Sequence, residues 1–291
     1  MREVWVRAMP LMFVFFWSTG FVAAKLGLPH IEPMTFLSVR FAIVVALMLP
    51  IAWISRATWP DSPRQWAHIA VSGAFLHGGY LGGVFASIHA GLSAGLTALI
   101  VGLQPILTAF AAALLFEERV TLRQWSGLLL GFIGVGFVLV NKISLDGLSV
   151  YGIAMAAVAL FSITAGTVYQ KRFCGHFDLR SGAVIQFVSA GLVLAPMAFA
   201  FETRQIEWSR ELVLAMIWLV VVLSIVSIAL LTLIIRRGAS TQVASLFYLV
   251  PPATALEAYL MFNETLSGMA ILGMVLAIIG VALVSTQAQS K

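Results

Sequence analysis

Residues 102–140 read GLQPILTAFAAALLFEERVTLRQWSGLLLGFIGVGFVLV, and residues 249–284 read LVPPATALEAYLMFNETLSGMAILGMVLAIIGVALV. After a shift of 146 residues the two stretches share a proline, a glutamate and a glycine framework in register. The pairs are Pro105/Pro251, Glu118/Glu264, Gly127/Gly273 and Gly134/Gly280. Biased composition alone would match Ala and Leu but not this framework. The chain therefore contains an internal duplication.

The composition places this duplication in a membrane. Of 291 residues, 61% are hydrophobic and 10% are charged, and the mean hydropathy is +1.01. Soluble domains carry roughly 25% charged residues, and about 20 apolar residues span a bilayer as a helix. Such stretches recur near residues 8–25, 34–54, 66–88, 92–115, 122–140, 149–170, 181–201, 211–235, 239–261 and 267–286. We expect an all-α integral membrane protein with ten transmembrane helices.

The duplication divides these helices into two repeats of five, residues 1–143 and 144–291. Because five is odd, the second repeat enters the membrane from the opposite side. Inverted repeats are typical of secondary transporters, whose substrate sites lie near the midplane between the halves. The alternative is that the duplication merely built a larger structural helix bundle.

The positive residues predict the orientation. Lys and Arg gather in cytoplasmic loops, and the expected outer segments hold only Lys25, Lys142, Arg204 and Arg210 of the 17. Both termini should therefore be cytoplasmic. This rule also accounts for the net charge of +5 without a nucleic-acid partner.

Several residues inside the expected helices suggest a substrate site. A site for an asymmetric solute must break the symmetry of the repeat, so the candidates are intramembrane polar or aromatic residues with a different residue in the other half. The substrate-binding candidates are Trp17, His77, Tyr80, Gln104 and Tyr248. His77 and Tyr80 share a helix face, and an intramembrane ionisable residue suggests function. Ordinary packing remains the alternative for each.

Structural or gating roles are expected for four other residues. Pro105 and Pro251 lie near the middle of their helices, where proline removes a backbone hydrogen bond and kinks the helix. Arg40 is the one cation well inside a span, and Glu257 is the acid available to it. We expect an Arg40–Glu257 interaction on the outer side of the cavity, with snorkelling of Arg40 to the interface as the alternative.

The repeated glycines of residues 122–140 and 267–286 form small-residue faces for close helix contact. We expect them to serve scaffold packing or a homodimer contact.

No enzymatic motif emerges from the sequence. It contains no G-x-x-x-x-G-K phosphate loop, and its five His residues show no metal-ligand spacing. We expect no cofactor, no metal and no catalytic residue.

The chain resembles the EamA-type metabolite exporters of the drug/metabolite transporter superfamily. The resemblance rests on FFWSTGFVAAK (15–25), PMTFLSVRFAIVVALML (33–49) and the two repeated stretches quoted above. It implies a multi-pass protein of the bacterial inner membrane that exports small metabolites by alternating access. The closest likeness is to exporters of amino acids, including aromatic ones. Alternatives are export of another solute, such as a drug-like compound, and a membrane-embedded enzyme or structural bundle.

Overall fold

The computed structural model describes residues 2–92, 94–116, 120–140, 149–175, 177–237, 240–262 and 267–285. Within these ranges the chain is helical apart from short connections and one isolated bridge between Ile31 and Ile206. The boundary expected between the repeats, at residues 143 and 144, lies outside the described residues. The all-α prediction is confirmed.

The first half runs through α1 (Arg2–Gly27), η1 (Leu28–His30), α2 (Pro33–Ile54), α3 (Pro63–Gly73), η2 (Ala74–Gly79), α4 (Tyr80–His89), α5 (Ala94–Val101), α6 (Gln104–Phe116) and α7 (Leu122–Leu139). The second half runs through α8 (Val150–Phe173), α9 (Leu179–Phe201), α10 (Arg210–Trp218), η3 (Leu219–Ser227), α11 (Ile228–Arg237), α12 (Ser240–Ser245), η4 (Leu246–Leu249), α13 (Val250–Phe262) and α14 (Gly268–Ser285). Segments η2 and η3 are π-helical, and η1 and η4 are 3₁₀ turns.

Six helical runs in the described residues are long and apolar enough to cross a membrane, and shorter apolar helices accompany them. Large apolar side chains such as Trp53 and Phe201 are exposed on the outer faces of helices. Soluble monomers rarely expose large apolar patches, whereas lipid covers them. The protein is a multi-pass membrane protein. The count of ten crossings remains a prediction.

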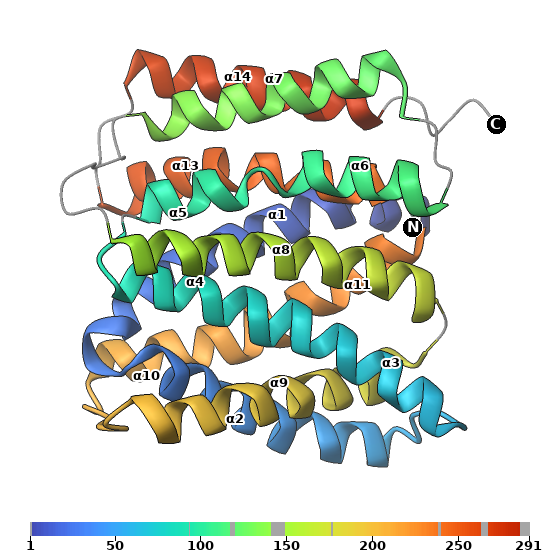
Figure 1. The fold of residues 1–291 in the computed structure, drawn as a ribbon, viewed down its shortest axis with the longest axis vertical. Coiled ribbons are helices and arrows are strands. Elements are labelled where there is room, and N and C mark those ends of the chain that lie inside the picture. Colours follow the sequence, from blue (N-terminus) through green and yellow to red (C-terminus); the bar gives the residue numbers. More distant parts are fainter. Residues whose placement is uncertain are drawn as a thin grey trace.

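Repeat mates pack against each other at the two edges of the bundle (Figure 1). Helices α7 and α14 lie side by side along one edge, and α2 and α9 lie side by side along the opposite edge. Helices α1, α4, α8 and α11 lie between these pairs. The duplicated sequence therefore forms one pair of repeat-related helices at each edge, and we call these two pairs the frame. The remaining helices lie between them.

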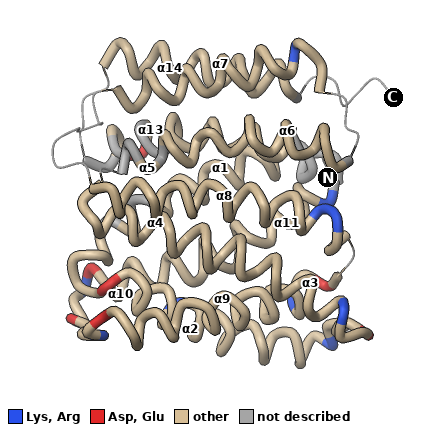
Figure 2. The backbone as a smooth tube through the Cα atoms, viewed as in Figure 1, with Lys and Arg blue, Asp and Glu red and all other residues tan. Residues whose placement is uncertain are grey.

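The two ends of the bundle differ in charge (Figure 2). Lys and Arg segments gather mainly at the end where α1 begins and α14 ends, whereas Asp and Glu segments gather mainly at the other end, near the start of α10. Which end faces the cytoplasm remains a prediction.

The regular α-helix is interrupted just before both prolines for which mid-helix kinks were predicted. Helix α5 ends at Val101 and α6 begins at Gln104, so Pro105 occupies the first turn of a new helix. Pro251 likewise follows the 3₁₀ turn η4 at the start of α13. Proline is tolerated there because a first-turn N–H has no intrahelical acceptor. The chain therefore breaks at the same place in each repeat.

The glycine faces of α7 and α14 pack on each other. A Cβ added to Gly134 would lie 2.6 Å from the carbonyl oxygen of Gly273, and one added to Gly280 would lie 2.6 Å from that of Gly127. These distances leave no room for any side chain. The faces are thus covered within the chain, and a homodimer through these two helices remains a prediction that must use other surfaces.

Replacing Gly134 by Ala should destabilise the fold by about 1–3 kcal/mol, the usual range for overpacking. Gly136 lies on the same helix with no atom within 4 Å of an added Cβ, so Gly136→Ala is the matched control. Thermal unfolding of both variants in detergent measures the effect. Equal melting temperatures for the two variants would contradict the assigned packing.

Candidate functional site

A cavity lies between the two halves of the chain. It contains about 560 Å³ of space between atoms, including the part open to solvent. Elements of both repeats line it: α1, α2, η2 and α4 from the first, and α9, η3 and α11 from the second. The lining residues are Trp17, Gly20, Ala24, Arg40, His77, Tyr80, Leu81, Val84, Phe85, Ile88, Phe187, Leu219, Leu223 and Ile228.

The cavity wall is mainly apolar and aromatic. The rings of Trp17 and Tyr80 are nearly parallel, with centroids 6.3 Å apart and an interplanar angle of 9°. Phe187 stacks on His77 with centroids 4.5 Å apart. Such rings present apolar faces with polar edges, which suits a solute with one apolar part and one polar part.

Among the described residues of this lining, Arg40 is the one that carries a charge. It is only 2% exposed, and its Nε donates a hydrogen bond to Ser224 Oγ at 3.0 Å. Among the described residues no other hydrogen bond and no ion pair of Arg40 is present. A guanidinium stays charged in proteins, so the cavity wall holds a cation that lacks a counter-ion in the described part of the chain.

His77 is also buried and unsatisfied. Its side chain is 1% exposed, and neither ring nitrogen has a hydrogen-bond partner within the described part of the chain. Buried polar atoms are nearly always hydrogen-bonded. An unpaired imidazole in a cavity wall therefore offers hydrogen bonding to an occupant.

The two π-helical segments contribute to this wall from both repeats. Shifting η2 by 146 residues places it on η3, so that His77 corresponds to Leu223 and both residues line the cavity. π-Helical insertions are frequent at functional sites because they redirect side chains. The glycines of HGGYLGG (77–83) accompany the first of these segments.

The sequence-based candidates divide into two groups. Trp17, His77 and Tyr80 line the cavity together, whereas Gln104 and Tyr248 are buried outside its lining. Gln104 Nε2 donates to Thr108 at 3.5 Å on its own helix. The Tyr248 ring packs on α7, where a Cβ added at Gly131 would lie 2.5 Å from it.

The expected ion pair between Arg40 and Glu257 is not formed. Arg40 bonds to Ser224, whereas Glu257 Oε1 accepts from Ser18 Oγ at 2.5 Å. Helix α1 explains the separation, because it packs against both α13 and η3. Its adjacent residues Trp17 and Ser18 point in directions about 100° apart, one toward the cavity and the other toward Glu257.

Sequence reasoning missed Phe187, Leu219 and Ser224. Phe187 is the repeat mate of Phe41. The candidates had to differ between the two halves, and this position is Phe in both. Leu219 and Ser224 lie in LVVVLSIVS (219–227), whose apolar sequence shows neither a π-helix nor a preferred face.

Groups of three or more His, Cys, Asp or Glu that could hold a metal are absent among the described residues. The candidate site is therefore described by its cavity and its hydrogen-bonding groups.

The sequence matches a known family over both halves. The model of the EamA-like transporter family matches residues 6–140 and again residues 150–286. The chain belongs to the EamA-like transporter family. The two matched ranges correspond to the two repeats seen in the sequence.

Relatives of this EamA protein include transporters. A Salmonella typhimurium protein named "Probable amino-acid metabolite efflux pump" is 25% identical over 282 residues, covering 93% of this chain and 91% of the relative. The Escherichia coli protein of the same name is 25% identical over 280 residues, covering 93% and 91%. A WAT1-related chloroplastic protein of Arabidopsis thaliana is 27% identical over 280 residues, covering 93% and 67%. These names support a membrane metabolite exporter, which is not an enzyme.

The fold has a counterpart among solved structures. One crystal structure superposes with a TM-score of 0.78 over 96% of this chain and 95% of that chain, at 20% identity. This similarity supports the fold alone.

In this EamA protein, helices α2 and α9 form a pair, and one acidic residue at each end of the pair joins the two helices. Shifting Glu32 by 146 residues gives Asp178, and each precedes a helix as its N-cap residue. Glu32 Oε2 accepts from the backbone N–H of Arg204 at 3.0 Å, and Asp178 Oδ2 accepts from that of Thr58 at 3.2 Å. Because Thr58 and Arg204 are repeat mates, the same contact between the two halves is made twice. It fixes the helices that carry Arg40 and Phe187.

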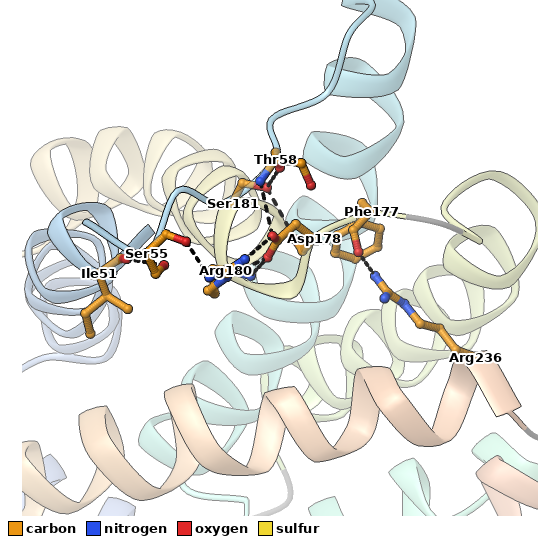
Figure 3. A network of polar contacts seen from close by, with 8 residues as sticks. All are labelled: Ile51, Ser55, Thr58, Phe177, Asp178, Arg180, Ser181 and Arg236. Carbon is orange, nitrogen blue, oxygen red and sulfur yellow. Dashed lines mark hydrogen bonds and ion pairs between the residues drawn. The ribbon is translucent and has the colours of Figure 1, made fainter. Parts of the chain in front are cut away.

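Figure 3 shows the cluster around Asp178. Arg180 donates to both carboxylate oxygens, at 2.9 and 2.5 Å, and also to the carbonyl oxygen of Ser55 at 3.0 Å. Arg236 of α11 donates to the carbonyl oxygen of Phe177 and lies over its ring. Hydrogen bonds from Arg180 lower the pKa of Asp178 to about 2.

Asp178 should stabilise the folded protein in a defined pH range. Because the folded-state pKa is below the unfolded value, its contribution is present above about pH 4 and is lost as the pH falls toward about 2. Asp178→Asn should therefore flatten the loss of melting temperature between pH 4 and pH 2. Asp61→Asn, in an exposed loop, is the control. An unchanged acid limb in Asp178→Asn would contradict this assignment.

Proposed function

We propose that this EamA-family exporter carries amino acids, including aromatic and other neutral ones, across the inner membrane as a secondary transporter that works by alternating access. The observation that carries this proposal is the cavity lined by Trp17, Tyr80 and His77 between the two repeats. Ligand sites are typically concave and mostly apolar, with a few well-placed polar groups. The cavity has this character.

The duplicated architecture supports alternating access. Two halves related by an inverted repeat can exchange roles, which provides two conformations of similar energy around one site. The breaks before Pro105 and Pro251, at equivalent positions, supply places where helices of each half can bend. The names of the bacterial relatives support amino acids as the transported class.

Purified protein in proteoliposomes should give saturable flux of radiolabelled phenylalanine, methionine or threonine. Trp17→Ala and Tyr80→Ala should each lower the transport efficiency for phenylalanine by about tenfold or more. The reason is that an apolar contact with the cavity wall contributes about 1–3 kcal/mol. The measured quantity is the maximal rate divided by the half-saturating concentration.

The matched controls are Trp53→Ala and Tyr259→Ala, which remove exposed aromatic residues of the same kinds. Both should transport at the wild-type rate. Absence of saturable flux for all three amino acids would reject the amino-acid assignment, and equal rates in Trp17→Ala and Trp53→Ala would remove Trp17 from the site.

A further inference from the structure

Arg40 is a buried cation that has no counter-ion among the described residues. It is 2% exposed in a helix surrounded by apolar residues, and its one hydrogen bond within the described chain goes to a neutral hydroxyl. Burying a charge without a partner costs several kcal/mol. Glu257, the acid that was predicted to pair with Arg40, instead accepts a hydrogen bond from Ser18 on another side of α1. A bound anion would supply the counter-ion that the described residues lack.

We propose that Arg40 binds the carboxylate of the transported solute, with His77 hydrogen-bonding the same end and the aromatic wall receiving the apolar part. This inference rests on the proposed function and specifies its substrate class. The class is small solutes with a single carboxylate and an apolar or aromatic side chain.

The geometry around the guanidinium suits this role. Ser224 accepts from Nε at 3.0 Å, which restrains the side chain while the two terminal nitrogens have no partner in the described residues. Arginine prefers bidentate contacts with carboxylates, made by two parallel N–H groups. His77 lines the same cavity with both ring nitrogens unpaired. The unsatisfied donors in the lining are therefore concentrated on these two residues.

The charge also disfavours other ligand classes. A phosphorylated solute carries about two negative charges and is usually held by several cations, whereas the described residues of this lining include one. A cationic drug would be repelled by Arg40 at low dielectric. A solute with one carboxylate and an apolar body matches the wall.

The second repeat shows why the site occurs once. The mate of Arg40 is Gln186, whose Nε2 donates to Ser72 Oγ and to Gln170 Oε1, both at 2.9 Å. The amide nitrogen of Gln186 is satisfied by these buried protein groups, and the residue does not line the cavity. At this position the second half therefore has an amide that is hydrogen-bonded to other protein groups, whereas the first half has an arginine that faces the cavity. We expect one carboxylate to be bound per transport cycle.

The wild-type protein tests this inference without a mutation. Radiolabelled L-phenylalanine bound to protein in nanodiscs at pH 7 is displaced with L-phenylalanine, 3-phenylpropionate or L-phenylalaninamide. The amide differs from the amino acid only at the carboxylate. It should compete on the order of 10- to 100-fold more weakly than phenylalanine, as expected for losing a charged hydrogen-bonded contact, and 3-phenylpropionate should compete measurably.

Arg40 variants test the residue itself. Arg40→Gln should lose the preference for phenylalanine over its amide, whereas Arg40→Lys should retain part of it. Arg210→Gln removes an exposed arginine at the start of α10 and serves as the control. Size-exclusion and thermal unfolding establish that each variant is folded, and the wild-type series decides the question if Arg40→Gln is not.

The outcomes separate this inference from the proposed function. Equal competition by phenylalanine and its amide in wild type, or an unchanged preference in folded Arg40→Gln, would overturn the role of Arg40 while flux of amino acids leaves the transporter assignment standing. Absence of flux for every amino acid would overturn the proposed function and this inference with it.

Discussion

The packing of repeat mates against each other is the constraint on which this structure depends. Helix α7 meets α14 through glycines at backbone distance, and α2 meets α9 through carboxylates that accept from each other's terminal loops. Both contacts are nearly symmetric because both partners derive from the same duplicated segment. In hydrocarbon, helix association depends on close packing and internal hydrogen bonds rather than on apolar burial. These two pairs supply both, and the central helices lie between them.

The cavity lies where this symmetry is broken. At Arg40 the first half places a cation in the wall, and at Gln186 the second half places an amide in a closed network. His77 and Leu223 show the same contrast on the two π-helical segments. A symmetric frame with an asymmetric interior suits a carrier, because the frame can adopt two related conformations while the site keeps its selectivity.

Much of the fold could be predicted from hydropathy and self-alignment. The spacing of apolar stretches predicted the helices, and the repeated Pro105 and Pro251 predicted where they break. The site was only partly predictable. Trp17, His77 and Tyr80, which line the cavity, were selected because they differ from their repeat mates. The Arg40–Glu257 pair was predicted only because Glu257 was the acid available inside the membrane, and it is not formed. That prediction ignored the face of α1 that separates them. The π-helical segments change which residues face inward, and no pattern in LVVVLSIVS (219–227) reveals this.

The central claim is that one cavity between two interchangeable halves moves its solute by alternating access. Counterflow tests it most directly. Proteoliposomes loaded with unlabelled phenylalanine and diluted into a trace of labelled phenylalanine should accumulate label transiently above equilibrium, because the loaded carrier returns faster than the empty one or exchanges outright. Label that only equilibrates, or never enters, would contradict a carrier and favour a channel, an enzyme or a structural bundle.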